Sequence, residues 1–423
     1  MNKIKRDFKK VLEIGLFNVL NASVINNVIA FLTNVLIVRI LSKTEFGMYG
    51  YAFNIISLCM LFSGLGVDAG ILQFCSEKRL INEKKQLYKF GLLFGCAINC
   101  LISLLILSYI AFFEISIPDA KPLFYAFLIW PILNFLFNYV LVILRTKKEN
   151  KLYSKFTNLN SICKFIFACL GAYLGGVYGY LIGIYMSFII VIIFFCYTKS
   201  SFIKELIPLS IKRISEYSYF LKYSLITVFN NGVSQLLYVI DVFLIGVFIS
   251  NPDIIANYKA STQIPFALYF ITTSVMIVIY PYIAEHYDNI EWIKNKLKSV
   301  MLFLFVLNLP ITLILYFGAP SIIKLLYGKA YLDSVPLFKV LALTYLFATM
   351  LRIPLGNILN MLRGVKMNLI NSIITGIANI VLDIILIKSI GSLGAALATL
   401  IVTFLSGLIS LLQCRYLFKK RNS

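Results

Sequence analysis

Long apolar runs recur along the whole chain and are separated by short polar breaks. Each run has about 20 residues, the length that an α-helix needs to cross the hydrocarbon core of a membrane. The sequence therefore predicts an all-α polytopic membrane protein with about twelve transmembrane helices. We place these helices at residues 15–38, 46–72, 90–112, 122–144, 153–173, 178–197, 217–249, 258–283, 299–317, 335–358, 368–387 and 392–414.

The composition excludes a soluble globular enzyme. Of the 423 residues, 60% are hydrophobic and 13% are charged, whereas a soluble domain has about 25% charged residues. The net charge of +21 would suit a nucleic-acid-binding protein only if the basic residues clustered on one solvent-exposed module. They are spread along the chain instead, so we expect the lipid bilayer and no nucleic acid as a partner.

The basic residues are distributed by side of the predicted membrane. Of the 39 Lys and Arg residues, 27 lie in the two terminal tails and in the connections after even-numbered spans, and 6 lie in the other connections. Cytoplasmic loops of membrane proteins are enriched in these residues. The asymmetry predicts that both termini are cytoplasmic.

Six spans followed by six would form two lobes with a parallel pseudo-two-fold repeat, related by an axis along the membrane normal. Weak internal matches support this, because an offset of 215 places Gly176 and Gly179 on Gly391 and Gly394. Compositional bias makes chance identities of this kind common. The expected parts are an N-terminal six-helix lobe, a cytoplasmic linker and a C-terminal six-helix lobe, at residues 1–200, 201–216 and 217–423.

The first predicted span of each lobe carries a polar stripe. A single Asn or Ser in a span commonly hydrogen-bonds to a neighbouring helix and holds the bundle together. Matching stripes on two corresponding helices favour a hydrated cavity between the lobes. The residues that we expect to line it are Asn27, Asn34, Asn230, Asn231, Ser234 and Asp241.

Lys164 and Arg352 are basic residues inside predicted spans. A charged side chain that faces lipid near the bilayer centre costs about 2.5–3.5 kcal/mol or more, so each must face protein or water. Pairing with Asp68, Asp241 or Asp383 is one explanation, and attraction of an anionic substrate such as a phosphate is the other. Asp241 is a candidate site for a coupling ion or proton and, equally, a candidate partner of a nearby cation.

The sequence carries no signal of catalysis. The eight cysteines lie in or beside spans and include no C-x-x-C pair, so neither a metal site nor a disulfide framework is expected. There is no Walker A motif, which argues against ATP-driven transport by this chain alone. We expect no catalytic residue, no cofactor and no metal.

Two stretches near the N-terminus resemble the polysaccharide flippases of the multidrug/oligosaccharidyl-lipid/polysaccharide (MOP) exporter superfamily. Residues Arg39–Tyr49 resemble the family's R-x-L-x-x-x-x-[FY]-G-x-Y turn between the first two helices. Residues Gly64–Gly70 resemble its Gly-rich end of the second helix.

Three further stretches resemble the same family. Asp241 followed by Ile255–Ala260 is similar to its D…x-x-G-x-Y-x-A pattern, although Ala256 replaces the usual Gly. Ala378–Asp383 followed by Gly391–Thr399 is similar to its N-x-x-L-[ND]…G-x-x-G-A-A-x-A-T signature. The matches extend over nearly the whole chain, although each alone is loose.

The resemblance implies a MATE-like MOP fold and a flippase of the bacterial cytoplasmic (inner) membrane. Its implied substrate is an undecaprenyl-pyrophosphate-linked oligosaccharide of O-antigen or capsule type, moved to the outer leaflet by alternating access, with a polysaccharide polymerase as a possible partner. The cations that the resemblance assigns to pyrophosphate or acidic sugars are Lys164, Arg352, Arg39, Arg145, Arg363 and Lys366. Ordinary enrichment of cytoplasmic loops in basic residues is the alternative explanation for Arg145, Arg363 and Lys366.

Two other functions stay open at this point. One is a MATE-type multidrug/cation antiporter, which shares the fold but translocates cations and suits a basic cavity poorly. The other is a non-transporting membrane subunit of a polysaccharide synthesis complex. The related lipid II flippases typically have two more helices than the sequence predicts here.

Overall fold

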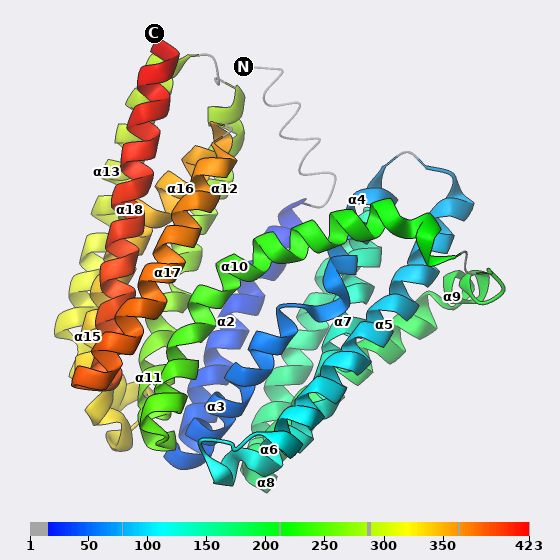
Figure 1. Cartoon of the computed structure of the whole chain (residues 1–423), viewed down its shortest axis with the longest axis horizontal. Helices are drawn as coiled ribbons and strands as arrows, with labels where there is room; N and C mark the ends of the chain where they lie inside the picture. The colour runs from blue at the N-terminus through cyan, green and yellow to red at the C-terminus, as the bar shows by residue number, and fades with distance from the viewer. Residues whose placement is uncertain (1–15, 78, 211–212, 286–288, 363, 423) are drawn as a thin grey trace. The chain divides into compact units, whose positions relative to one another are not determined.

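The computed structural model describes residues 16–422 except residues 78, 211–212, 286–288 and 363. Every regular element in this described part is a helix (Figure 1). Hydrocarbon offers no hydrogen-bond partner to a backbone amide, so a membrane segment satisfies its own backbone by forming a helix.

Nine helical segments of the described residues are long and apolar enough to cross a membrane. The longest, Asn150–Thr198, has 49 residues and contains non-helical backbone at Gly175 and Gly176, so it holds two of the predicted spans. The helices α10 and α11–α12, bounded below, cover the predicted spans 217–249 and 258–283. An all-α polytopic fold of about twelve helices is therefore confirmed.

The chain divides into two compact units. One contains residues 52–232 together with the chain before residue 46, and the other contains residues 46–51 and 233–423. The elements up to the shared helix α10 are α2 (Leu16–Ile40), α3 (Lys43–Met60), η1 (Ser63–Gly66), α4 (Val67–Ser76), α5 (Ile81–Phe112), η2 (Pro118–Ala120), α6 (Lys121–Ala126), η3 (Phe127–Ile129), α7 (Trp130–Thr146), α8 (Asn150–Thr198), α9 (Ser200–Leu206), η4 (Ile214–Tyr217) and α10 (Ser218–Ile249).

The elements after α10 belong to the second unit. They are α11 (Pro252–Ala267), α12 (Tyr269–Glu285), α13 (Ile290–Phe317), α14 (Ala319–Leu326), η5 (Lys329–Ser334), α15 (Val335–Phe347), the π-helical η6 (Ala348–Arg352), α16 (Ile353–Met361), α17 (Val365–Ile390) and α18 (Ser392–Asn422). The two last helices lie side by side along their length (Figure 1).

This division falls within α10, whereas the expected lobe boundary precedes that helix. The reason is aromatic packing, because the ring of Phe74 in α4 lies 5.4, 5.8 and 5.5 Å from the rings of Tyr219, Phe220 and Tyr223. The first half of α10 is thereby part of the first unit. The assignment of lobes to residues 1–200 and 217–423 stays a prediction.

The expected linker also packs on the first unit. Lys85 Nζ in α5 lies 2.9 Å from Glu205 Oε2 in α9. The ring of the buried Phe202 in α9 packs edge-on against the ring of Tyr88, with 5.5 Å between the ring centres. The amine of Lys147 lies 3.3 Å from the centre of the same Phe202 ring. Burial lowers the pKa of Lys147, as expected of an amine moved out of water.

Glycines form two hairpin turns with the same backbone. Gly176 within α8 has φ 57° and ψ −142°, and Gly391 between α17 and α18 has φ 67° and ψ −149°. Only glycine adopts this region without strain. These are the residues that the offset of 215 aligns, so the weak sequence match coincides with a matching turn.

The α8 hairpin provides a test of this close packing. A Cβ on Gly179 would lie 2.0 Å from the Gly171 carbonyl oxygen, whereas a Cβ on Gly175 would meet nothing within 4 Å. Gly179→Ala should therefore lower the thermal unfolding midpoint of the purified protein, because overpacking costs about 1–3 kcal/mol. Gly175→Ala is the matched control, and equal midpoints for the two variants would contradict the packing described here.

Candidate functional site

A polar cluster lies in the second unit and joins four helices. The Tyr258 hydroxyl of α11 donates a hydrogen bond to Asp241 Oδ2 of α10 at 2.5 Å, and the Thr399 hydroxyl of α18 donates to the same oxygen at 2.7 Å. Asn379 Nδ2 of α17 lies 2.8 Å from Asp383 Oδ2 and 3.5 Å from Asp241 Oδ1. One amide thus contacts both carboxylates.

The cluster is closed to solvent. Asp241 is 5% exposed, Asp383 is fully buried, and Tyr258 is 1% exposed. The second oxygen of Asp383, Oδ1, is buried without a hydrogen-bond donor. Within the described residues no ion pair joins either Asp to a basic side chain. Two carboxylates in such a place need a proton or a bound cation to balance their charge.

The donor set suits a hard monovalent cation or a proton. The cluster contains the carboxylate oxygens of Asp241 and Asp383 and the hydroxyl oxygens of Tyr258 and Thr399, beside the amide nitrogen of Asn379. Oxygens of these kinds bind hard cations. Transporters place Na⁺ and proton sites among oxygens of this kind inside a helical bundle. The expectation that Asp241 pairs with a cationic side chain is not met in the described part of the chain.

Lys164 lies in the first unit, in the middle of a membrane-crossing helix. It follows Asn150 by 14 residues and precedes the break at Gly175 by 11, which places it about 21 Å from the start of α8. It is half-buried, and no described carboxylate forms an ion pair with it. One turn earlier, the amide oxygen of Asn160 is buried without a donor. Pairing with an aspartate therefore does not account for Lys164.

Arg352 occupies an irregular turn in the second unit. It ends the single π-helical segment η6, which interrupts the run from α15 into α16, and Pro354 follows two residues later. Its side chain is half-buried. π-Helical turns inside α-helices occur often at functional sites, because they re-aim side chains.

The other expected cations do not form one group. Arg39 is exposed in the last turn of α2. It precedes Glu45 by six residues in the sequence, and a Cβ on Gly176 at the turn of α8 would lie 2.5 Å from Glu45 Oε1. Arg145 is exposed at the end of α7, next to the opposite end of the same stretch of α8. The first half of α8 is about 38 Å long, so Arg39 and Arg145 cannot contact one headgroup. A substrate contact of either residue stays a prediction.

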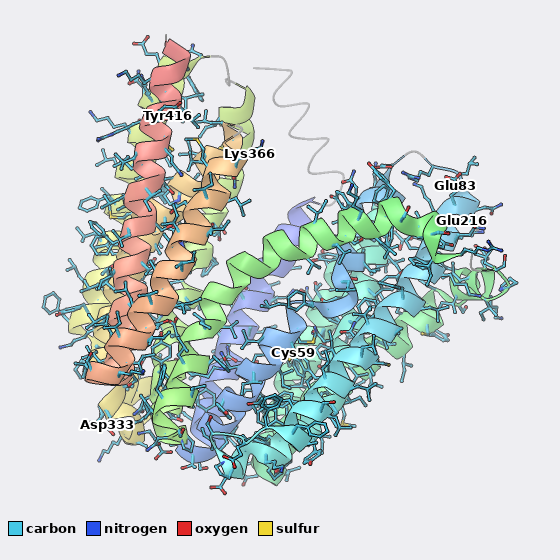
Figure 2. All side chains as sticks on the ribbon, viewed as in Figure 1. Cys59, Glu83, Glu216, Asp333, Lys366 and Tyr416 are labelled. Atoms are coloured by element: carbon cyan, nitrogen blue, oxygen red, sulfur yellow. The ribbon has the colours of Figure 1, made fainter. Side chains whose placement is uncertain are left out.

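The remaining two expected cations belong to the second unit. Lys366 is exposed at the start of α17, at the same end of the α17–α18 pair as Tyr416 (Figure 2). Arg363 lies outside the described residues.

Of the two expected polar stripes, the structure describes the side chains of the first, on α2. Asn27 and Asn34 are both exposed on α2, whereas the neighbouring Thr33 is buried and donates to the Ile29 carbonyl at 2.7 Å. Polar side chains on the open face of a membrane helix indicate contact with water or substrate rather than lipid. The side chains of Asn230, Asn231 and Ser234 lie outside the described residues.

Comparisons with known proteins agree with this architecture. A family described as "Polysaccharide biosynthesis protein" matches residues 36–336. The chain belongs to this polysaccharide biosynthesis family. No curated protein matches it in sequence.

Solved structures with the same fold identify the architecture of this family member. The lipid II flippase MurJ in an inward closed conformation is 19% identical, with a TM-score of 0.77, covering 95% of this chain and 89% of that one. An inward-facing multidrug resistance MATE family transporter of the MOP superfamily is 14% identical, with a TM-score of 0.70, covering 94% and 95%. The fold is therefore the one that these MOP superfamily proteins share, as the sequence motifs predicted, and its apolar helices make the chain a multi-pass membrane protein.

A third solved structure has the same fold. It is a MOP superfamily transporter from Pyrococcus furiosus Vc1, for which a reverse polarity of the binding pocket is reported. It is 14% identical, with a TM-score of 0.61, covering 98% of this chain and 97% of that one.

Asp241 and Asp383 stand out in the sequence as ionisable residues inside apolar spans, but the group that they form with Tyr258, Asn379 and Thr399 does not. Asn379, Asp383 and Thr399 stand in the motif stretches of the last two helices, and Tyr258 stands in the stretch after Asp241. Their polar character inside otherwise apolar segments was the available signal. Their meeting point could not be predicted, because it depends on how α10, α11, α17 and α18 pack.

The cluster predicts a cation- or proton-dependent stability. Na⁺ at 100 times its Kd should raise the unfolding free energy by about 2.7 kcal/mol, seen as a higher thermal midpoint than in choline chloride. Asp383→Asn should abolish this increase, and Asp119→Asn in the exposed η2 turn should preserve it.

If a proton occupies the cluster instead, Na⁺ will have no effect and the midpoint will depend on pH in the wild type but not in Asp383→Asn. A wild-type midpoint that responds to neither ion nor pH would contradict a coupling role for these residues.

Proposed function

We propose that this protein flips undecaprenyl-pyrophosphate-linked oligosaccharide repeat units, of O-antigen or capsule type, from the cytoplasmic to the outer leaflet by alternating access. It would act in the bacterial cytoplasmic membrane, with both termini in the cytoplasm and a polysaccharide polymerase as a neighbour that receives its product. The observation that carries the proposal is Lys164, a cation in mid-membrane without a described carboxylate partner.

A lysine at this depth has to be compensated by a counter-charge. The chain itself supplies none among the described residues, so a transported anion is the remaining source. A pyrophosphate bears the charge that such an amine attracts, and a hydrogen bond to a charged group contributes about 1.5–3 kcal/mol. Asn27 and Asn34, exposed on α2 of the same unit, offer amide groups for sugar hydroxyls.

The acidic cluster supports an ion gradient as the energy source. Tyr258 and Lys259 are adjacent in α11, and each makes a different contact. Tyr258 hydrogen-bonds to Asp241 at 2.5 Å, and Lys259 Nζ donates to the Gly50 carbonyl at 3.3 Å. Gly50 belongs to residues 46–51, the part of α3 that packs with the second unit. Binding or release of a cation at Asp241 would therefore act on the contact between α11 and α3.

This contact is tight enough to transmit such a change. A Cβ on Gly47 would lie 1.9 Å from the Pro252 carbonyl oxygen at the start of α11, and a Cβ on Gly246 would lie 2.5 Å from the Tyr51 ring. Well-packed helices respond to a local shift by moving as bodies rather than by deforming. The rest of α3 belongs to the first unit, so α3 connects the coupling cluster to the helices around Lys164.

A MATE-type cation antiporter is the competing function. The carboxylates that could bind a cation, Asp241 and Asp383, are 5% and 0% exposed, and such burial does not suit the binding of a cation the size of a drug. The unpaired Lys164 would repel a cationic drug. A non-transporting subunit would need neither charge.

The deciding experiment compares Lys164→Ala with Lys164→Arg in a strain that lacks the gene and any redundant flippase. Loss of one charged contact should lower the appearance of lipid-linked repeat units in the outer leaflet by about 10- to 100-fold, with accumulation in the cytoplasmic leaflet. Lys164→Arg should restore most of the activity, because the charge is kept.

Lys151→Ala is the matched control, since Lys151 is exposed at the start of the same helix, and it should behave as the wild type. Normal surface polymer in the deletion strain would reject the flippase function. Full activity of Lys164→Ala would reject only the role of Lys164.

A further inference from the structure

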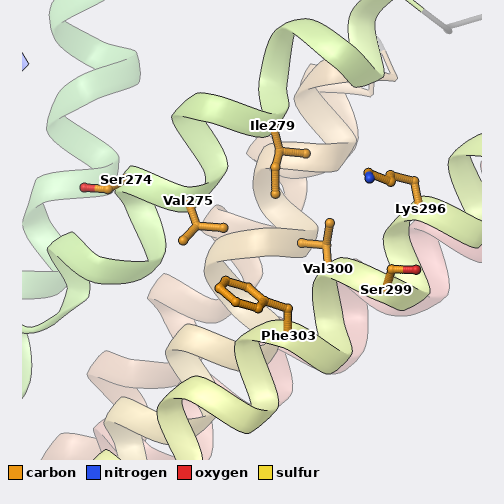
Figure 3. A pocket seen from close by; sticks show the side chains of 7 residues that line it. All are labelled: Ser274, Val275, Ile279, Lys296, Ser299, Val300 and Phe303. Atoms are coloured by element: carbon orange, nitrogen blue, oxygen red, sulfur yellow. The ribbon is translucent and has the colours of Figure 1, made fainter. Parts of the chain in front are cut away.

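A groove of about 590 Å³ lies between α12 and α13 in the second unit. Its walls are mainly apolar, formed by Val275 and Ile279 of α12 and by Val300 and Phe303 of α13, and Ser274 and Ser299 also line it. Figure 3 shows Lys296 at its edge, with the amine directed toward Ile279 and Val300. The volume falls within the range of about 300–1,000 Å³ that is typical of small-molecule sites.

The groove changes from polar to apolar along the helix. Lys296 is six residues after Ile290, where α13 begins, so it is about 9 Å from that end, and Phe303 is about 20 Å from it. The first distance corresponds to the interfacial layer and the second to the hydrocarbon. The groove therefore has a cation at headgroup level and an apolar channel below it, which is the pattern of a lipid with one phosphate and a hydrocarbon chain.

Among the described residues the amine of Lys296 has no acidic partner, and no acidic residue is among those that line the groove. A lysine at the membrane surface attracts anionic lipid headgroups. Its aliphatic stem can lie along the apolar wall while the amine reaches the phosphate.

We propose that this groove binds an anionic glycerophospholipid of the leaflet next to the start of α13, with an acyl chain along Val275, Val300 and Phe303 and the phosphate at Lys296. A single amine matches the single charge of a phosphodiester. The pyrophosphate and sugars of a lipid-linked glycan would need more donors than this groove provides. The site is separate from Lys164 and from the Asp241 cluster, and it does not depend on the proposed transport function.

The chain provides its own reporter for this site. It contains two tryptophans, and Trp292 precedes Lys296 by four residues in α13, so both side chains lie on one face of the helix. Trp130 is buried in the first unit among the rings of Phe53 and Phe188. The variant Trp130→Phe leaves Trp292 as the one tryptophan of the chain.

The test reconstitutes Trp130→Phe in phosphatidylcholine vesicles that contain a small fraction of lipid with brominated acyl chains. Brominated phosphatidylglycerol should quench Trp292 with about five-fold higher apparent affinity than brominated phosphatidylcholine, since one lysine near the surface contributes about 1 kcal/mol. Adding Lys296→Gln should remove the preference. Lys298→Gln, an exposed lysine on a different face of α13, is the matched control and should keep it.

Native mass spectrometry of the otherwise unchanged chain provides a second measurement, in which Lys296→Gln should retain fewer phosphatidylglycerol molecules than Lys298→Gln. Equal quenching by the two brominated lipids, or a preference that survives Lys296→Gln, would overturn the proposal. Relief of the quenching by a low mole fraction of undecaprenyl phosphate, but not by unlabelled phosphatidylglycerol, would also overturn it by assigning the groove to the substrate anchor.

Discussion

Hydrocarbon solvates neither a backbone amide nor a charge, and the rest of this structure follows from that property. Each membrane segment closes its hydrogen bonds within its own helix. Where the helix must stop, a local device satisfies the free groups. Ser42 and Glu45 form a capping box at the start of α3, and Asn251 caps α11. At the two hairpins, glycine adopts a backbone conformation with positive φ that other residues avoid. The chain can therefore reverse its direction within a short turn that leaves few backbone amides exposed.

The same property sorts the charged side chains into three environments. Asp241 and Asp383 are buried together and accept hydrogen bonds from a phenol, an alcohol and an amide. Lys164 is half-buried in mid-helix, and no described carboxylate forms an ion pair with it. Lys296 sits at interfacial depth, where a lipid phosphate is the available partner.

Helix α11 connects two of these features. Its residues 258 and 259 contact the acidic cluster and the start of α3, respectively. These two contacts cannot change independently, because consecutive residues of a helix move together. Both α3 and α10 contain residues of each compact unit, so each of these helices runs without a break from one unit into the other.

The sequence by itself determined the helical class, the approximate extent of the spans and the family, because these depend on local hydropathy and short motifs. The apolar run at 299–317, for example, lies within α13, and the paired glycines at 176 and 391 mark matching turns. It also singled out Lys164 and Asp241, since an ionisable residue in an apolar run is conspicuous. Only the tertiary structure decided which charges meet. Asp241, Tyr258, Asn379 and Thr399 are far apart in the chain, and Arg39 and Arg145 belong to opposite ends of one helix bundle. Hydropathy records how deep a residue lies in the membrane but not which way its helix faces, and helix rotation and packing determine whether two charges become partners.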